Sequence, residues 1–309
     1  MFHDVLNENG KETLGKLISF SNGKKRPDEE GQIPVYGGNG ILAYTNKANA
    51  SNCVIIGRVG AYCGNVCLSL DDCWISDNAI SAKSKISKSQ LFVFSILKNE
   101  NLEQQAQAIY AQMFIESAEE SWETGSLSDI AVITMGQSPK GDTFNETGEG
   151  AVFYQGRTDF GFRFPTRRLY TTEPKRIALC DDALMSVRAP VGDLNVAYEE
   201  CCIGRGLAAI HSKDNHQSFV LYTLFTLKKQ LDVFNGEGTV FGSINKESLN
   251  SMEITIPPRE LMDRFESTIS PIDRAIRNNY EEICRLQAIR DTLLPKLMNG
   301  EIDVSAVKI

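Results

Sequence analysis

The chain has 309 residues, of which 42% are hydrophobic and 23% charged, and its formal net charge at pH 7 is −8. This composition is typical of a globular protein, and the length suffices for two domains of ordinary size. The net charge argues against general adhesion of the whole surface to nucleic acid, but not against a local basic surface. No apolar run approaches the ~20 residues of a membrane span, and the start of the sequence lacks an apolar signal segment, so we expect a cytoplasmic protein with no membrane partner.

Two stretches of the chain share one order of sequence features, which indicates an internal repeat. The first copy opens at residues 14–23, LGKLISFSNG, and the second at residues 127–136, LSDIAVITMG. The later matching segments, in order, are residues 33–40 with 151–157, 54–60 with 183–190, and 74–80 with 202–210. Runs of β-branched residues broken by glycine and asparagine predict short strands joined by tight turns.

The two copies end differently. Each turns helical after its strands, at residues 91–98 and at residues 219–230. The second copy continues through residues 239–258, whereas the first passes directly into residues 99–105, so the tail of the first copy and the opening of its next helix are missing. We therefore expect four parts, which are a shortened first module at residues 1–98, a short central helix and linker at 99–122, a second module at 123–257, and a long helix at 258–309.

A long helix is predicted for Arg259–Met298. Its apolar residues recur at steps of three and four, which places them on one stripe of the helix. A narrow apolar seam on so long a helix favours a partner helix over a globular core. Pro271 lies early in the pattern, where a proline can bend a helix, and Gly300 follows its end. The residues that we expect to pack along this seam are Phe265, Ile269, Ile272, Ile276, Ile283, Leu286, Ile289 and Leu293.

A second, shorter helical pattern covers residues 100–116, with Leu102, Ala106, Ile109, Met113 and Phe114 on one face. For a single short helix, packing into a core is the ordinary interpretation. Two such helices, each following a similar module, favour an antiparallel helical pair that spaces the modules. The sequence therefore predicts a mixed α+β fold (α/β in the broad sense), with two β-rich modules joined by an antiparallel coiled-coil spacer.

The sequence lacks the familiar motifs for catalysis and metal binding. Residues 136–143, GQSPKGDT, imitate a phosphate-binding loop, but Asp142 stands where the lysine is needed. None of the eight cysteines forms a C-x-x-C pair, and no histidine is spaced to complete a zinc site. We therefore expect no catalytic residue, no metal site and no cofactor in this chain.

Local basic and polar features are better suited to reading DNA. Arginine can pair with guanine or phosphate, asparagine and glutamine can pair with adenine, and glycine turns allow close approach to the duplex. The alternative is that these residues are solvated loop charges that contact no ligand. Among these features, the loop at residues 163–168 is the stronger candidate for DNA contact. The candidate DNA-contacting residues are Lys24, Lys25, Arg26, Tyr36, Asn39, Arg58, Gln155, Arg157, Arg163, Arg167, Arg168 and Arg188.

The chain resembles the specificity (S) subunit of type I restriction-modification systems. The resemblance is carried by IPVYGGNG at residues 33–40, SDNAI at 76–80, NLEQQAQAIY at 101–110 and the helical residues 286–300. Each string alone is weak, but the same order of segments occurs twice, and each copy is followed by a helix. The resemblance covers nearly the whole chain.

The resemblance implies two target recognition domains, each reading one half of a split site in double-stranded DNA, and a coiled coil that sets their spacing. It implies modification subunits that methylate adenine with S-adenosylmethionine, and restriction subunits that cleave DNA with ATP and Mg²⁺, so this chain is itself no enzyme. The shortened first module departs from the family pattern. It leaves open a truncated or recombined subunit that binds the modification subunit without reading a full DNA site.

Overall fold

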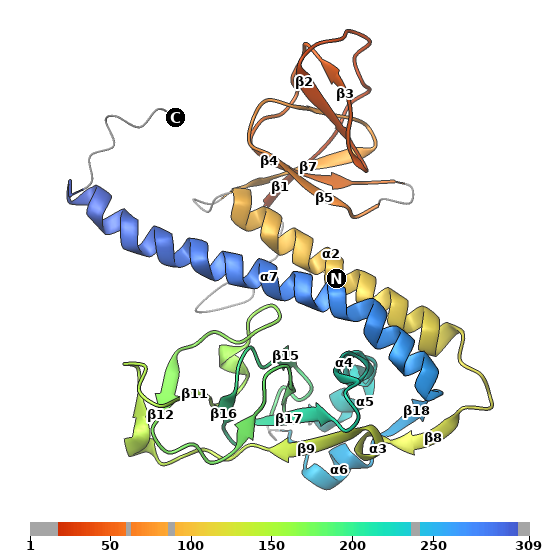
Figure 1. Ribbon diagram of the computed structural model, residues 1–309, viewed down its shortest axis with the longest axis vertical. Coiled ribbons are helices and arrows are strands. Elements are labelled where there is room, and N and C mark those ends of the chain that lie inside the picture. The colour runs from red at the N-terminus through yellow and green to blue at the C-terminus, as the bar shows by residue number, and fades with distance from the viewer. Residues whose placement is uncertain (1–17, 60–62, 86–89, 236–241, 302–309) are drawn as a thin grey trace. The chain divides into compact units, whose positions relative to one another are not determined.

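The protein has a mixed α+β architecture with several β-sheets and two long helices in contact (Figure 1). The computed structural model describes residues 18–59, 63–85, 90–235 and 242–301. The chain divides into two compact units, of which the first holds residues 1–105 and 272–309 and the second holds residues 106–271. Among the described helices, none combines the length and the apolar character that crossing a membrane requires.

The first unit contains two small sheets. A four-stranded antiparallel sheet has the order β1-β7-β4-β5, and a three-stranded sheet has the order β3-β2-β6. Alternate residues of β4 are buried on opposite faces, because Val54 packs with Val93 and Leu97 of the following helix, while Ile55 packs with Cys73. The strands are β1 (Ile18–Asn22), β2 (Ile33–Gly37), β3 (Gly40–Thr45), β4 (Cys53–Gly57), β5 (Val66–Ser69), β6 (Trp74–Ile75) and β7 (Ala79–Ser84).

The second unit contains sheets of five, four and two strands. Their orders are β10-β12-β11-β16-β13, β15-β14-β17-β9 and β18-β8. The strands are β8 (Glu123–Ser126), β9 (Ala131–Met135), β10 (Phe144–Asn145), β11 (Ala151–Tyr154), β12 (Leu169–Thr171), β13 (Ile177–Ala178), β14 (Ala183–Ser186), β15 (Leu194–Val196), β16 (Cys201–Ile203), β17 (Leu207–Ser212) and β18 (Glu253–Ile256). The short helices are α3 (Leu127–Ile130), α4 (Gln217–Thr226), α5 (Lys228–Asp232) and α6 (Lys246–Asn250).

The internal repeat predicted from the sequence is confirmed by the strand order. The first unit has β1-β7-β4-β5, and the second has the matching order β9-β17-β14-β15. In both units a further strand pair is parallel, β2 with β6 and β11 with β16. Gly64 and Gly192 follow β4 and β14 at matching places, and both have a positive φ, of 87° and 84°, which suits glycine. The two copies therefore share one fold.

The helical segments predicted separately at residues 91–98 and 100–116 form one continuous helix, α2 (Gln90–Ala111), followed by a π-helical turn at Gln112–Glu116. No glycine or proline lies within α2 to end it, so the helix of the first copy runs directly into the predicted spacer helix. In the second copy, α4, α5, α6 and β18 precede the next long helix.

The long helix α7 spans Arg259–Met298, as the apolar periodicity predicts. It continues through Pro271 as one helix, although the missing N–H of the proline costs one intrahelical hydrogen bond. In the second unit the Phe265 ring meets the Tyr110 ring edge-on at 5.6 Å, and in the first unit the Asn279 amide donates to the Asn99 Oδ1 at 2.7 Å. Residue numbers thus rise along α2 as they fall along α7.

The apolar seam of α7 is buried unevenly. Phe265, Ile269 and Ile276 are fully buried. Ile272, Ile283 and Leu286 are half-buried, whereas Ile289 and Leu293 are 45% and 41% exposed. The C-terminal part of the seam is therefore open in the chain alone.

Candidate nucleic-acid interface

Four chain segments meet at one end of the repeated fold in the first unit. They are the residues after β1, β2 and β4 and the β6–β7 turn, and we call them the first loop cluster. Backbone hydrogen bonds hold them together, since the Lys24 N–H donates to the Ile75 carbonyl at 2.9 Å and the Ser76 N–H donates to the Tyr36 carbonyl at 2.9 Å. The Arg58 N–H likewise donates to the Asn78 carbonyl at 2.9 Å.

The second unit contains an equivalent second loop cluster, built from the residues after β9, β11 and β14 and from the β16–β17 turn. The Gln137 N–H donates to the Ile203 carbonyl at 2.9 Å, and the Gly204 N–H donates to the Tyr154 carbonyl at 2.8 Å. The Val187 N–H donates to the Gly206 carbonyl at 3.0 Å. Each bond matches one in the first unit, so the two clusters have the same backbone framework and differ in their side chains.

The side chains of the first loop cluster are polar and exposed, and they carry both signs of charge. Lys24, Lys25, Arg26 and Arg58 are all exposed there, and Asp77 is the acidic residue of the turn. The Arg58 guanidinium donates to the Asn22 Oδ1 at 3.4 Å, and the described residues leave most of its other donors open to another acceptor. The exposed acidic residues Asp28, Glu29 and Glu30 follow the basic run in the same segment, so the basic side chains of this cluster are local groups rather than a surface of one sign.

The second loop cluster exposes several arginines, and they differ in their partners. Arg157 forms an ion pair with Asp193, which lies 3.6 Å from the Lys228 ammonium as well. Arg188 and Arg205 are exposed, and within the part of the chain that the structure describes neither guanidinium has an ion-pair partner. Their positive charges are therefore open to an external anion or hydrogen-bond acceptor.

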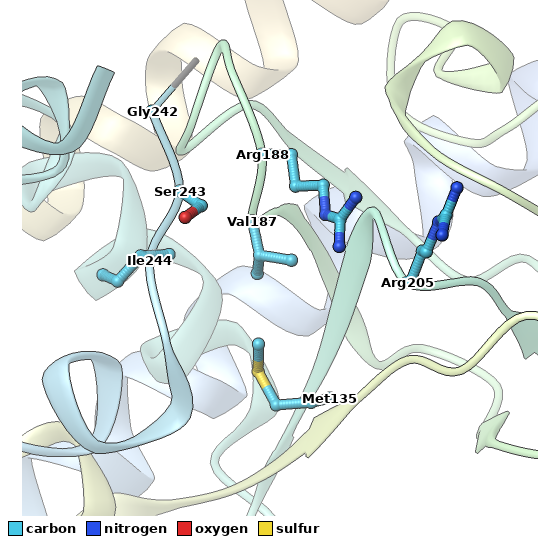
Figure 2. A pocket seen from close by; sticks show the side chains of 7 residues that line it. All are labelled: Met135, Val187, Arg188, Arg205, Gly242, Ser243 and Ile244. Carbon is cyan, nitrogen blue, oxygen red and sulfur yellow. The ribbon is translucent and has the colours of Figure 1, made fainter. Parts of the chain in front are cut away.

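Arg188 and Arg205 line a surface hollow of about 390 Å³, together with Met135, Val187, Gly242, Ser243 and Ile244 (Figure 2). The segment Gly242–Ile244 runs alongside the end of β14, because the Ala189 N–H donates to the Gly242 carbonyl at 2.9 Å and the Ile244 N–H donates to the Val187 carbonyl at 3.1 Å. The hollow thus has an apolar base and two cationic side chains. Such a surface is suited to a polyanionic ligand, whose charged groups the two arginines could contact.

The predicted loop at residues 163–168 is largely engaged within the protein. Arg163 is buried, and its guanidinium lies 5.7 Å from the centre of the Tyr222 ring. Arg167 pairs with Glu199, and its guanidinium also stacks over Tyr198 at 5.5 Å. Arg168 lies 3.1 Å from the carboxylate of Asp159, which is itself buried. Arg167 and Arg168 remain exposed, but part of their charge is already balanced.

The remaining candidates divide between the loop clusters and the core. Asn39 and Gln155 are exposed at the ends of equivalent strands and belong to the first and second loop clusters. Tyr36 is half-buried and packs against a core that includes Cys53 and Ile75. Burial raises the pKa of the Tyr36 hydroxyl above its ordinary value, as expected for a ring turned toward the protein interior.

Arg205 was not among the residues predicted from sequence to contact DNA. Its flanking residues, Gly204 and Gly206, were recognised as part of the repeat, but the partner position in the first copy holds an acidic residue. The sequence signal that could have identified Arg205 is the pair of glycines on either side of it in the turn. A Cβ atom on Gly206 would lie 2.8 Å from the Gln155 carbonyl oxygen, so small residues beside Arg205 allow β11 to approach the turn.

A further cluster of titratable side chains, around His216, forms hydrogen bonds and ion pairs within the folded chain. His216 is buried between Asp263, at 2.7 Å, and Asp214, at 3.0 Å. Burial alone lowers the pKa of His216, but the hydrogen bonds and charges of the two carboxylates outweigh it, and the net pKa is raised. Among the residues that the structure describes, no group of three or more histidine, cysteine or acidic side chains is arranged to hold a metal ion.

Comparison with known proteins gives a consistent set of relatives. The family model described as the type I restriction modification DNA specificity domain matches residues 119–285, which is more than half of the chain. The putative type I restriction enzyme MjaX specificity subunit of Methanocaldococcus jannaschii is 38% identical over 191 residues, which are 60% of this chain and 44% of that protein. The HindI specificity subunit of Haemophilus influenzae is 25% identical over 191 residues, which are 59% of this chain and 42% of that protein.

The chain was also compared with solved structures, and two of the matches carry related descriptions. The HsdS subunit from Thermoanaerobacter tengcongensis is 22% identical, with a TM-score of 0.46 and coverage of 94% of this chain and 96% of that one. The type I restriction-modification S subunit from M. genitalium is 16% identical, with a TM-score of 0.48 and coverage of 96% and 98%. The matched part of this chain spans less than half the length of each curated relative named above. From the family model that matches residues 119–285, the chain belongs to the family of type I restriction-modification DNA specificity proteins.

Proposed function

We propose that this chain reads the DNA sequence for a type I restriction-modification complex, with one loop cluster on each half of a split site. The observation that carries the proposal is the pair of equivalent loop clusters. Both expose basic side chains on an acidic chain, and both are fixed by matching backbone hydrogen bonds. A rigid framework with variable polar side chains is suited to reading base edges, while the cations hold the phosphate backbone.

In this proposal the two modules are target recognition domains, at residues 1–98 and 123–257, and α2 and α7 form the antiparallel spacer between them. The Phe265–Tyr110 and Asn279–Asn99 contacts support the helical pairing. The open end of the α7 seam, which includes Ile289 and Leu293, is suited to a partner subunit. The partners would be modification subunits that use S-adenosylmethionine and restriction subunits that use ATP and Mg²⁺.

The test is to express the chain with its cognate modification subunit and to map adenine methylation across a genome. Methylation at a split motif with two different halves is the expected result, because the side chains of the two loop clusters differ. A symmetric motif would mean that one module acts twice in a dimer. Absence of methylation from a complex that still co-purifies would favour the alternative of a shortened subunit that binds its partner without reading a full site.

A further inference from the structure

The β6–β7 and β16–β17 turns place opposite charges at one structural position. In the first turn the Ala79 N–H donates to the Ser76 carbonyl at 3.0 Å, and in the second the Leu207 N–H donates to the Gly204 carbonyl at 2.9 Å. Both are four-residue turns closed by the same hydrogen bond. The second residue is Asp77 in one turn and Arg205 in the other, and both side chains are exposed.

Each turn is held on both sides by the rest of its loop cluster. Its first residue donates to the end of β2 or β11, and its third residue accepts from the residue after β4 or β14, at distances of 2.8 to 3.0 Å. In the second unit the Arg205 N–H also points to the Ser138 hydroxyl at 3.3 Å. Side chains on such a fixed base project in a defined direction, which is what base recognition requires.

Among the described residues, neither the Asp77 carboxylate nor the Arg205 guanidinium has an ion-pair partner. This separates Arg205 from Arg157, Arg167 and Arg168, which all have carboxylate partners. The unpaired charge of Asp77 also restricts the groups of DNA that this side chain can contact. A carboxylate is repelled by phosphate, so in a loop cluster that faces DNA it needs a hydrogen-bond donor, and the donors in the major groove are amino groups of the bases.

We infer that Asp77 and Arg205 are base-reading residues at equivalent positions of the two modules, which read cytosine and guanine, respectively. The Arg205 fork pairs with the O6 and N7 atoms of guanine, and the Asp77 carboxylate accepts from the N4 amino group of cytosine. The inference rests on the proposed function and adds to it the residue in each module that distinguishes the two half-sites. One bidentate contact of this kind gives roughly 10- to 100-fold discrimination between bases.

The test uses the complex of the full chain with its modification subunit, and measures affinity for a set of sites in which each position of the wild-type motif carries each of the four bases in turn. In Arg205→Ala the preference for guanine at one position of the second half-site should fall by roughly 10- to 100-fold, with the first half-site unchanged. Arg205→Lys should lose most of the same preference, because a lysine keeps the charge but lacks the fork.

The first module offers a test by change of specificity. Asp77→Asn should shift the preference at one position of the first half-site from cytosine toward adenine, because the asparagine amide suits the N6 and N7 atoms of adenine. The control is Lys175→Ala, an exposed residue outside both loop clusters that lies 3.8 Å from Glu173, and all base preferences should be unchanged in it.

Three outcomes would overturn the inference. A uniform loss of affinity across all bases in Arg205→Ala and Arg205→Lys would make Arg205 a phosphate contact, and unchanged affinity would remove it from the interface. Unchanged base preferences in Asp77→Asn would do the same for the first module. In these cases a split wild-type motif still supports the proposed function, whereas a wild-type complex with no sequence preference refutes both.

Discussion

The aromatic cluster at the start of α7 gives the sharpest prediction of stability. The Phe265 side chain is fully buried, and its ring meets three others edge-on, Phe114 at 5.2 Å, Tyr110 at 5.6 Å and Tyr222 at 5.9 Å. Removing a buried phenylalanine ring typically costs about 3–5 kcal/mol, and three ring contacts place this site toward the upper end. We expect Phe265→Ala to lower the free energy of unfolding of the second unit by about 4 kcal/mol.

The assay is urea denaturation followed by the fluorescence of Trp122, whose ring lies 6.3 Å from that of Phe114. The chain has two tryptophans, and a Trp74→Phe background leaves Trp122 as the reporter of the second unit. Phe265→Leu keeps most of the volume and should cost about 1–2 kcal/mol. Ile289→Ala, on the same helix but 45% exposed, is the control and should cost less than about 1 kcal/mol. If Phe265→Ala and Ile289→Ala have equal effects, the cluster does not hold α7 to the second unit.

Three further predictions concern charge. Arg188→Ala should weaken binding of the assembled complex to DNA and reduce the slope of log affinity against log salt by about 1, and an unchanged slope would remove Arg188 from the phosphate contacts. Burial and the neighbouring Glu103 raise the pKa of Glu100 to about 7, so its neutral form contributes stability that is lost as the pH rises through that value. Glu100→Gln should therefore raise the free energy of unfolding at pH 8 by on the order of 3 kcal/mol and have little effect at pH 5, as measured by denaturation at the two pH values, and a gain independent of pH would contradict this. Because the pKa of His216 is raised, its ion pairs stabilise the fold below about pH 6.5 and fade above the raised pKa, so Asp263→Asn should cost more stability at pH 6 than at pH 9, as measured by thermal melts, and equal costs would contradict the assignment.

Local pattern determined the features that the sequence predicted well. The bounds of α7 follow from an apolar period that continues unbroken from Arg259 to Met298, and Pro271 did not interrupt it. The repeat was visible because the same turn residues recur between apolar runs, and Gly23 and Gly136 both end the first strand of their copies. The full extent of α2 was not predicted, because the repeat places a module boundary near Lys98, whereas the local sequence there contains no helix breaker.

Ion pairs between residues that are distant in sequence determine which arginines of the candidate site are free, and these could not be predicted. Arg167 and Arg168 looked like free cations in a basic loop, but their partners Glu199 and Asp159 are brought to them only by the folded chain. Arg205 looked unremarkable between two glycines, yet the fold places it beside Arg188 on the same hollow. Whether a surface charge is free or balanced depends on residues that are distant in sequence, and no local pattern records it.

The balance between free and paired charges bears on how an acidic chain can read DNA. Affinity that comes from phosphate contacts does not depend on sequence, so each additional free cation strengthens binding to every site equally. In the second loop cluster the Arg157 charge is offset by Asp193, while Arg188 and Arg205 are left open. With two open arginines described in this cluster against a net charge of −8 for the chain, non-specific attraction is weak, and discrimination between bases contributes a larger share of the binding energy. The isolated chain should accordingly bind DNA weakly and with a shallow salt dependence, and tight binding should require the further phosphate contacts that partner subunits supply.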